Sequence, residues 1–156
     1  MHTRRDLLSG SAKVAAMLAA AGLLPSLAQA ADAPGYATAA FAAKTIPDLM
    51  KALGAGAPVQ SADVTVTGPD IAENGAVVPI GASTALPGVK RVLLLVEKNP
   101  AVMSAMFDVT PDIEPAFATR VKMGQSSDVY AVAMMNDGRV LFAKKEVKVT
   151  LGGCGG

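Results

Sequence analysis

The sequence predicts an all-β protein, a β-sandwich with one short helix before it and a glycine-rich tail after it. From Ala62 onward, apolar segments that alternate with polar residues are separated by turn residues at intervals of roughly 10 to 25 positions. This spacing is typical of a sandwich and not of alternating strands and helices. About 126 residues remain after an N-terminal leader, which is enough to build one cooperative core.

Residues 1–30 have the features of an export signal. The Arg4-Arg5 pair comes just before an apolar run, 14–27, that is too short and too rich in alanine to predict a membrane span. Small residues at 28–30 indicate a cleavage site, which puts the mature start at Ala31. The arginine pair predicts the twin-arginine (Tat) route, with an ordinary Sec leader as the alternative. Either route places the mature protein outside the cytoplasm, with no membrane anchor once the signal is removed.

The segment after the leader predicts one helix. Residues 31–43 are small and low in complexity, and we expect a loose lead-in there. Thr45 is a good helix cap, Pro47 suits the first turn, and Gly54 is a natural stop. The apolar residues between these signals share one helical face: Ile46, Leu49, Met50 and Leu53.

Strands are predicted at 63–67, 76–82, 89–97, 117–123, 129–135 and 139–150. The segment 89–97 is apolar on both faces, as expected for a central strand that is covered on each side. Asp137-Gly138 supplies the positive backbone angles of a tight hairpin between the last two strands. We expect a polar loop at 68–75, and irregular structure from Asn99 to Asp112, where two prolines interrupt the pattern.

Composition excludes several classes of function. The single histidine, His2, lies in the leader, so the mature chain has no Ser-His-Asp or Cys-His catalytic group and no His-ligated metal. Without Arg4, Arg5, Lys13 and Asp6, 11 basic and 12 acidic residues remain, a net charge of about −1. No basic stripe is interleaved with aromatic residues, and we therefore expect no nucleic-acid binding.

Two other groups of residues could suggest chemistry. Asp70 and Glu73 are close enough in sequence for an acid–base pair or calcium ligands, but their Pro, Asn and Gly neighbours favour a turn. The six methionines of the mature chain could suggest a thioether copper site, but their apolar neighbours favour core packing. We therefore expect no metal, no cofactor and no catalytic residue.

The last five residues contain the only cysteine: Gly152, Gly153, Cys154, Gly155 and Gly156. Glycine loses the most backbone entropy on ordering, so four glycines around one cysteine predict a flexible arm. The arm could carry the thiol on the order of 10 Å beyond the last strand, into a narrow active site of another protein. No base in the tail activates the thiol, and an ordinary thiol is only a few per cent ionised at neutral pH. We therefore predict that Cys154 is a covalent substrate attachment point serviced by separate enzymes.

Other uses of Cys154 remain open at this point. It could be an unremarkable tail thiol, or it could form an intermolecular disulfide in a structural or adhesion module with an immunoglobulin-like fold. An exposed lone thiol is a liability in an oxidising compartment unless it is used. A cross-link does not need glycine on both sides, whereas a substrate arm does. An enzyme acting alone is the least favoured alternative.

Five segments of the chain together resemble the SoxY family, the sulfur-carrying subunits of the SoxYZ complex: 72–75, 96–100, 120–127, 146–150 and the terminal GGCGG. The resemblance extends over nearly all of residues 31–156 and to the twin-arginine leader. It implies an immunoglobulin-like β-sandwich at 31–151, followed by a substrate-carrying arm at 152–156. Cys154 corresponds to the cysteine of the family's tail.

The resemblance also implies partners. The protein would form a heterodimer with SoxZ in the periplasm, and an apolar face or edge around 107–117 is the candidate surface for SoxZ. A Sox c-type cytochrome would join thiosulfate to Cys154, and a dimanganese hydrolase would then release sulfate. A sulfane dehydrogenase would oxidise the sulfur that remains. The protein itself would be a carrier and not an enzyme.

Overall fold

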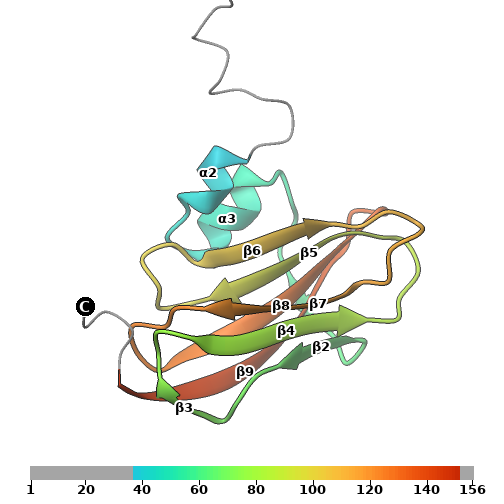
Figure 1. Ribbon diagram of the computed structural model, residues 1–156. Helices are drawn as coiled ribbons and strands as arrows, with labels where there is room; N and C mark the ends of the chain where they lie inside the picture. Colours follow the sequence, from blue (N-terminus) through green and yellow to red (C-terminus); the bar gives the residue numbers. More distant parts are fainter. Residues whose placement is uncertain (1–36, 152–156) are drawn as a thin grey trace, which may run out of the picture. The chain divides into compact units, whose positions relative to one another are not determined.

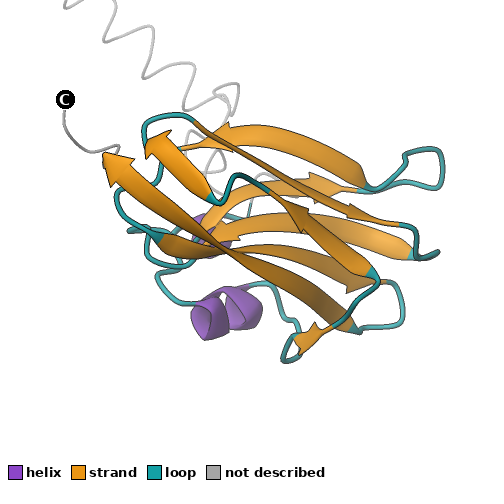
Figure 2. Ribbon diagram, turned by 90° about the horizontal axis from the view of Figure 1, so that it is seen from below, coloured by secondary structure: helices purple, strands orange, loops and turns teal. Residues whose placement is uncertain are grey.

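The alternating segments form two β-sheets that pack face to face (Figure 1 and Figure 2). The computed structural model describes residues 37–151, so the predicted signal at 1–30 and arm at 152–156 lie outside the described residues. The larger sheet has the order β1-β9-β8-β5-β6, with β3 also paired to β9, and the smaller sheet has the order β2-β4-β7.

The strands of the larger sheet are β1 (Val59–Gln60), β3 (Ile71–Asn74), β5 (Val89–Val96), β6 (Met103–Asp108), β8 (Ser127–Met135) and β9 (Val140–Leu151). Those of the smaller sheet are β2 (Val64–Thr67), β4 (Val78–Thr84) and β7 (Ala116–Val121). Two helices precede them, α2 (Thr38–Phe41) and α3 (Ile46–Ala52).

The interior of the sandwich is built from the facing sides of the two sheets. Val92, Leu94 and Val96 of β5 are buried there, in one apolar cluster with residues of β2, β4, β7 and β8. Leu93 and Leu95, which alternate with them, are fully buried in a second cluster on the opposite face of the sheet. This arrangement confirms the prediction that 89–97 is a central strand covered on both sides.

The second cluster lies beneath the helices, which cover part of the outer face of the larger sheet (Figure 1). The start of α3 confirms the predicted cap, because the Thr45 hydroxyl accepts a hydrogen bond from the Asp48 N–H at 3.2 Å. Leu49 and Met50 are the buried residues of this helix. Gly54 follows its end with a φ of 62°, as a helix stop requires.

The prediction of a loose lead-in at 31–43 is wrong for the part of it that is described. α2 lies inside this segment, Ala40 is fully buried and Ala43 is 7% exposed. The Ala43 carbonyl also accepts a hydrogen bond from the Val102 N–H at 3.0 Å. Small side chains let this backbone lie close to its neighbours, so their abundance reflects close packing and not disorder.

The prediction of irregular structure from Asn99 to Asp112 is wrong at its centre, which forms β6. This strand pairs antiparallel with β5 at the edge of the larger sheet. Pro100 and Pro111 lie before and after it, where proline removes no ladder hydrogen bond. The two prolines therefore delimit an edge strand.

The prediction of a polar loop at 68–75 is also wrong in part, because this segment contains β3. The strand pairs in parallel with the end of β9, with Ile71 opposite Lys148 and Asn74 opposite Leu151. Of its four residues only Ala72 is buried. A strand with so little apolar surface leaves no alternating pattern in the sequence.

The predicted tight turn at Asp137-Gly138 and the predicted core packing of the methionines are confirmed. Gly138 adopts a φ of 90° in the hairpin between β8 and β9. Phe107 of β6 and Phe117 of β7 stack with their ring centroids 4.4 Å apart, and both pack against the sandwich interior. The methionines fill the two apolar clusters on either side of the larger sheet, as expected for core residues: Met50, Met103, Met106, Met123, Met134 and Met135.

Candidate functional site

The predicted attachment residue, Cys154, and the tail glycines Gly152, Gly153, Gly155 and Gly156 lie outside the described residues. The structure describes the root of this tail, the last four residues of β9 at 148–151. The end of β9 lies beside β3 at one end of the sandwich (Figure 1). The candidate functional site is therefore this strand end and the segments that hold it.

The end of β9 extends beyond β8. The pairing between these strands stops at Ser127 and Val147, so residues 148–151 have no partner in β8. On the other edge of β9, β3 continues the pairing as far as Asn74 and Leu151. The tail thus leaves the sandwich from a strand end that is held by a neighbouring strand on one edge.

Two hydroxyl groups add contacts to this strand end. The Val149 N–H donates to the hydroxyl of Ser126 at 2.9 Å, on the edge where β8 has ended. The Thr150 hydroxyl donates to the Glu73 carbonyl of β3 at 2.8 Å. We call β3, residues 123–126 and residues 148–151 the arm clamp.

The arm clamp is tied to the sandwich interior through Met123. This side chain is fully buried, and its N–H donates to the Gly75 carbonyl at 2.7 Å. Gly75 directly follows β3, where the Ala76 N–H donates to the side chain of Asn74 at 2.8 Å and closes an Asx turn. Residues 123–126 therefore hold the end of β3 through Met123 and β9 through Ser126.

The segment 96–100 reaches the same end of the sandwich. The Lys98 N–H donates to the Ser127 hydroxyl at 3.1 Å, and the Asn99 side chain donates to the Lys122 carbonyl at 2.7 Å. Ser127 is 2% exposed, and its hydroxyl also donates to the Asp128 carbonyl. The segments singled out in the sequence at 72–75, 96–100 and 120–127 thus gather around the point where β9 ends.

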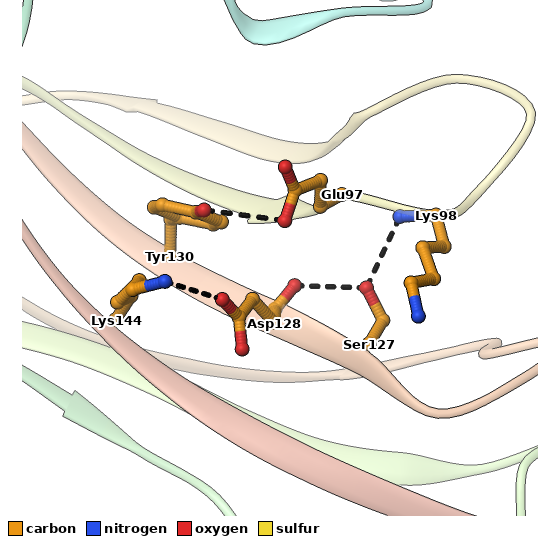
Figure 3. Close-up of polar contacts among 6 residues, drawn as sticks. All are labelled: Glu97, Lys98, Ser127, Asp128, Tyr130 and Lys144. Carbon is orange, nitrogen blue, oxygen red and sulfur yellow. Dashed lines mark hydrogen bonds and ion pairs between the residues drawn. The ribbon is translucent and has the colours of Figure 1, made fainter.

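A charged cluster lies near this point on the side of the larger sheet that faces away from the smaller one (Figure 3). Lys144 pairs with Asp128 at 2.6 Å, and the Tyr130 hydroxyl donates to Glu97 at 3.2 Å. The hydrogen bond to Asp128 raises the pKa of Lys144. Burial first, and then the charge of Glu97, raise the pKa of Tyr130. Both groups keep their protons at neutral pH, so they act as hydrogen-bond donors and not as bases.

The carboxylates that could have suggested chemistry are exposed. Asp70 is 89% exposed and pairs with Lys145 at 2.9 Å, and Glu73 is exposed on β3. Among residues 37–151, no group of three or more His, Cys, Asp or Glu is arranged to hold a metal ion. No helix in the same part of the chain is long and apolar enough to cross a membrane.

The contacts of the arm clamp were not expected from the sequence. Ser126 and Thr150 are ordinary polar residues of a loop and a strand, and nothing local shows what their hydroxyls meet. Three segments marked by the resemblance, 72–75, 120–127 and 146–150, contain most of the clamp residues. That resemblance was the one signal that could have indicated a shared location.

Comparison with known proteins shows the family and the fold to which the chain is similar. A family model described as "Sulfur oxidation protein SoxY" matches residues 49–154. The solved structure of the sulfur carrier protein SoxY from Chlorobium limicola f thiosulfatophilum is similar, with a TM-score of 0.61 and 30% sequence identity over 67% of this chain and 94% of that chain. A superoxide reductase (neelaredoxin) from Ignicoccus hospitalis has a TM-score of 0.50 and 21% identity over 55% and 79% of the two chains, which shows a shared fold alone. No curated protein matches the sequence.

Proposed function

Because this chain belongs to the SoxY family of sulfur oxidation proteins, we propose that it is a sulfur carrier that holds thiosulfate-derived groups covalently on Cys154. The observation that carries the proposal is the extent of the family match, which reaches Cys154, the only cysteine in the chain. A solved relative that is 30% identical is itself described as a sulfur carrier protein. The immunoglobulin-like sandwich supplies a rigid body from which the tail extends.

Loading of the carrier is an oxidation. The Cys154 thiol and the outer sulfur of thiosulfate form a sulfur–sulfur bond, one proton is released, and two electrons pass to an acceptor. A c-type cytochrome supplies that acceptor in its haem iron. Hydrolysis then cleaves the bond to the sulfonate group: water provides the oxygen, sulfate leaves, and a persulfide remains on Cys154. The carrier donates the thiol and separate enzymes do the chemistry, since the mature chain has no histidine to act as a base.

The proposal includes a location and a partner. Residues 1–30 would direct export to the periplasm by the Tat route, in keeping with Arg4-Arg5 before an apolar run. SoxZ would form a heterodimer with the sandwich. The tail would then be bound in turn by the Sox cytochrome, the dimanganese hydrolase and the sulfane dehydrogenase. Replacing both arginines with lysine should leave unprocessed precursor in the cytoplasmic fraction. Normal export of that variant would contradict the Tat route and favour Sec.

Intact mass spectrometry tests the carrier function. The purified chain, incubated with thiosulfate and the Sox cytochrome, should gain in neutral mass the mass of one S2O3 group, since a proton on the sulfonate replaces the proton lost from the thiol. A fragment containing the last five residues should carry this mass. Cys154→Ser is the matched control and should gain nothing while its unfolding curve stays unchanged. An unmodified wild-type chain, or a disulfide-linked dimer as its main product, would contradict the proposal.

A further inference from the structure

We propose that Ser126 and Thr150 are positioning residues for the carrier reaction. They hold residues 148–151 in place, so that the tail bearing Cys154 starts from a fixed point on the sandwich. This inference rests on the proposed function of Cys154 and adds two hydrogen bonds that fix the point from which its arm begins.

The geometry shows why these two hydroxyls matter. Beyond Ser127 and Val147, β9 has lost one neighbouring strand. The strand that remains, β3, has four residues, of which three are exposed, and it pairs in parallel. A parallel pair this short is weak by itself. On the edge of β9 that β8 no longer covers, the Ser126 hydroxyl accepts a hydrogen bond from the Val149 N–H. On the edge that faces β3, the Thr150 hydroxyl donates a hydrogen bond to the Glu73 carbonyl.

The expected consequence is a shift in the root of the tail. With the arm clamp closed, Cys154 is three residues beyond the end of β9 at Leu151. If residues 148–151 detach from β3 and Ser126, Val147 becomes the last residue held by the sheet, and it is seven residues before Cys154. The effective concentration of a tethered group falls as about the −3/2 power of the tether length, so this shift lowers it roughly threefold to fourfold.

The experiment uses four single variants of the full mature chain. Ser126→Ala and Thr150→Val each remove one hydroxyl, and Ser126→Thr keeps a hydroxyl at the same position. Ser61→Ala is the matched control, because its hydroxyl also accepts a backbone N–H, from Asp63 at 3.1 Å, at the other end of β9. Ser61 lies next to β1, which pairs with β9 near Phe142.

Hydrogen exchange measures the arm clamp directly. In Ser126→Ala the Val149 amide should exchange about fivefold faster or more, as expected for the loss of one hydrogen bond, while amides in the middle of β8 are unchanged. A nitroxide label on Cys154 should give a more mobile spectrum in Ser126→Ala and Thr150→Val than in the wild type. Ser126→Thr should keep the exchange rate and the nitroxide spectrum close to those of the wild type, and Ser61→Ala should change neither.

Loading kinetics then separate positioning from general stability. With thiosulfate and the Sox cytochrome, Ser126→Ala and Thr150→Val should each raise the KM for the carrier, by as much as about threefold to fourfold where residues 148–151 detach fully, and leave kcat near the wild-type value. The small disulfide reagent DTNB needs no defined approach, so its reaction rate with Cys154 should be unchanged. A wild-type chain that loads normally, together with unchanged KM and nitroxide mobility in both variants, would overturn the clamp proposal. A wild-type chain that does not load would overturn the proposed function instead, while the exchange and nitroxide measurements still decide whether the clamp exists.

Discussion

Replacing Lys145 with methionine should lower the free energy of unfolding by about 1–2 kcal/mol, because one carbonyl loses its hydrogen bond. The ammonium of Lys145 lies 2.7 Å from the Gly68 carbonyl oxygen and 2.9 Å from the carboxylate of Asp70. This side chain joins β9 to the crossing between β2 and β3, just before the arm clamp. Methionine keeps most of the aliphatic stem but has no donor.

The exposed fractions decide which of the two contacts carries the energy. The Asp70 side chain is 89% exposed and that of Lys145 is 33% exposed, so water and salt weaken the ion pair to about 0–1 kcal/mol. The bond to Gly68 is partly buried and its donor is charged. Such bonds contribute roughly 1.5–3 kcal/mol, part of which methionine recovers by packing. The matched variant Asp70→Asn should therefore cost less than about 0.5 kcal/mol.

Urea unfolding at low and high salt tests this reasoning. Lys145→Met should lower the urea midpoint at both salt concentrations, while the dependence of the free energy of unfolding on urea concentration stays the same. Asp70→Asn should behave like the wild type. The midpoint temperature of thermal unfolding should fall by several degrees in Lys145→Met, at about 3–5 °C per kcal/mol for a domain of this size. The reasoning is wrong if Asp70→Asn costs as much as Lys145→Met. It is also wrong if the cost of Lys145→Met disappears at high salt, because the ion pair would then be the main contact.

Two further predictions concern the helix cap and the outer face of the larger sheet. Thr45→Ala should lower the free energy of unfolding by about 1 kcal/mol, whereas Thr45→Ser should keep most of the wild-type stability. Equal stability of the wild type and both variants in urea would contradict the cap. In a Tyr36→Phe background, absorbance at the phenolate band should give Tyr130 a midpoint above its ordinary pKa of 10.0. Because the pKa is raised in the folded state, the phenol contributes stability that is complete below pH 10 and is lost as the pH rises through the raised value. Glu97→Gln should lower this midpoint and Lys144→Met should raise it; shifts in the opposite directions would refute the assigned causes.

The features that sequence reasoning predicted well are those with a local physical cause. The cap at Thr45 depends on a hydroxyl three residues from the N–H that it accepts. The hairpin at Gly138 depends on a positive φ that glycine adopts without strain. The central strand at 89–97 shows its burial directly in its unbroken run of apolar side chains. Each of these signals is complete within a few residues.

The features that were predicted wrongly depend on distant partners. β3 is a strand because the end of β9 offers it a free edge, and its own residues are mostly exposed. β6 lies between prolines that look like interruptions until its place at the sheet edge is known. The small residues at 31–43 suggested a loose lead-in, although Ala40 packs in the cluster beneath the helices.

For the candidate site, the sequence predicts the chemistry, and the fold shows which segments hold the strand that leads to it. One cysteine among four glycines, in a chain whose single histidine is His2, is the basis for predicting a covalent attachment point, because reactivity depends on which groups are present. The hydroxyls that hold the root of the tail became visible only when the fold brought Ser126 to Val149 and Thr150 to Glu73. A hydrogen bond depends on the distance between two groups, and for segments far apart in the chain only the folded structure sets that distance.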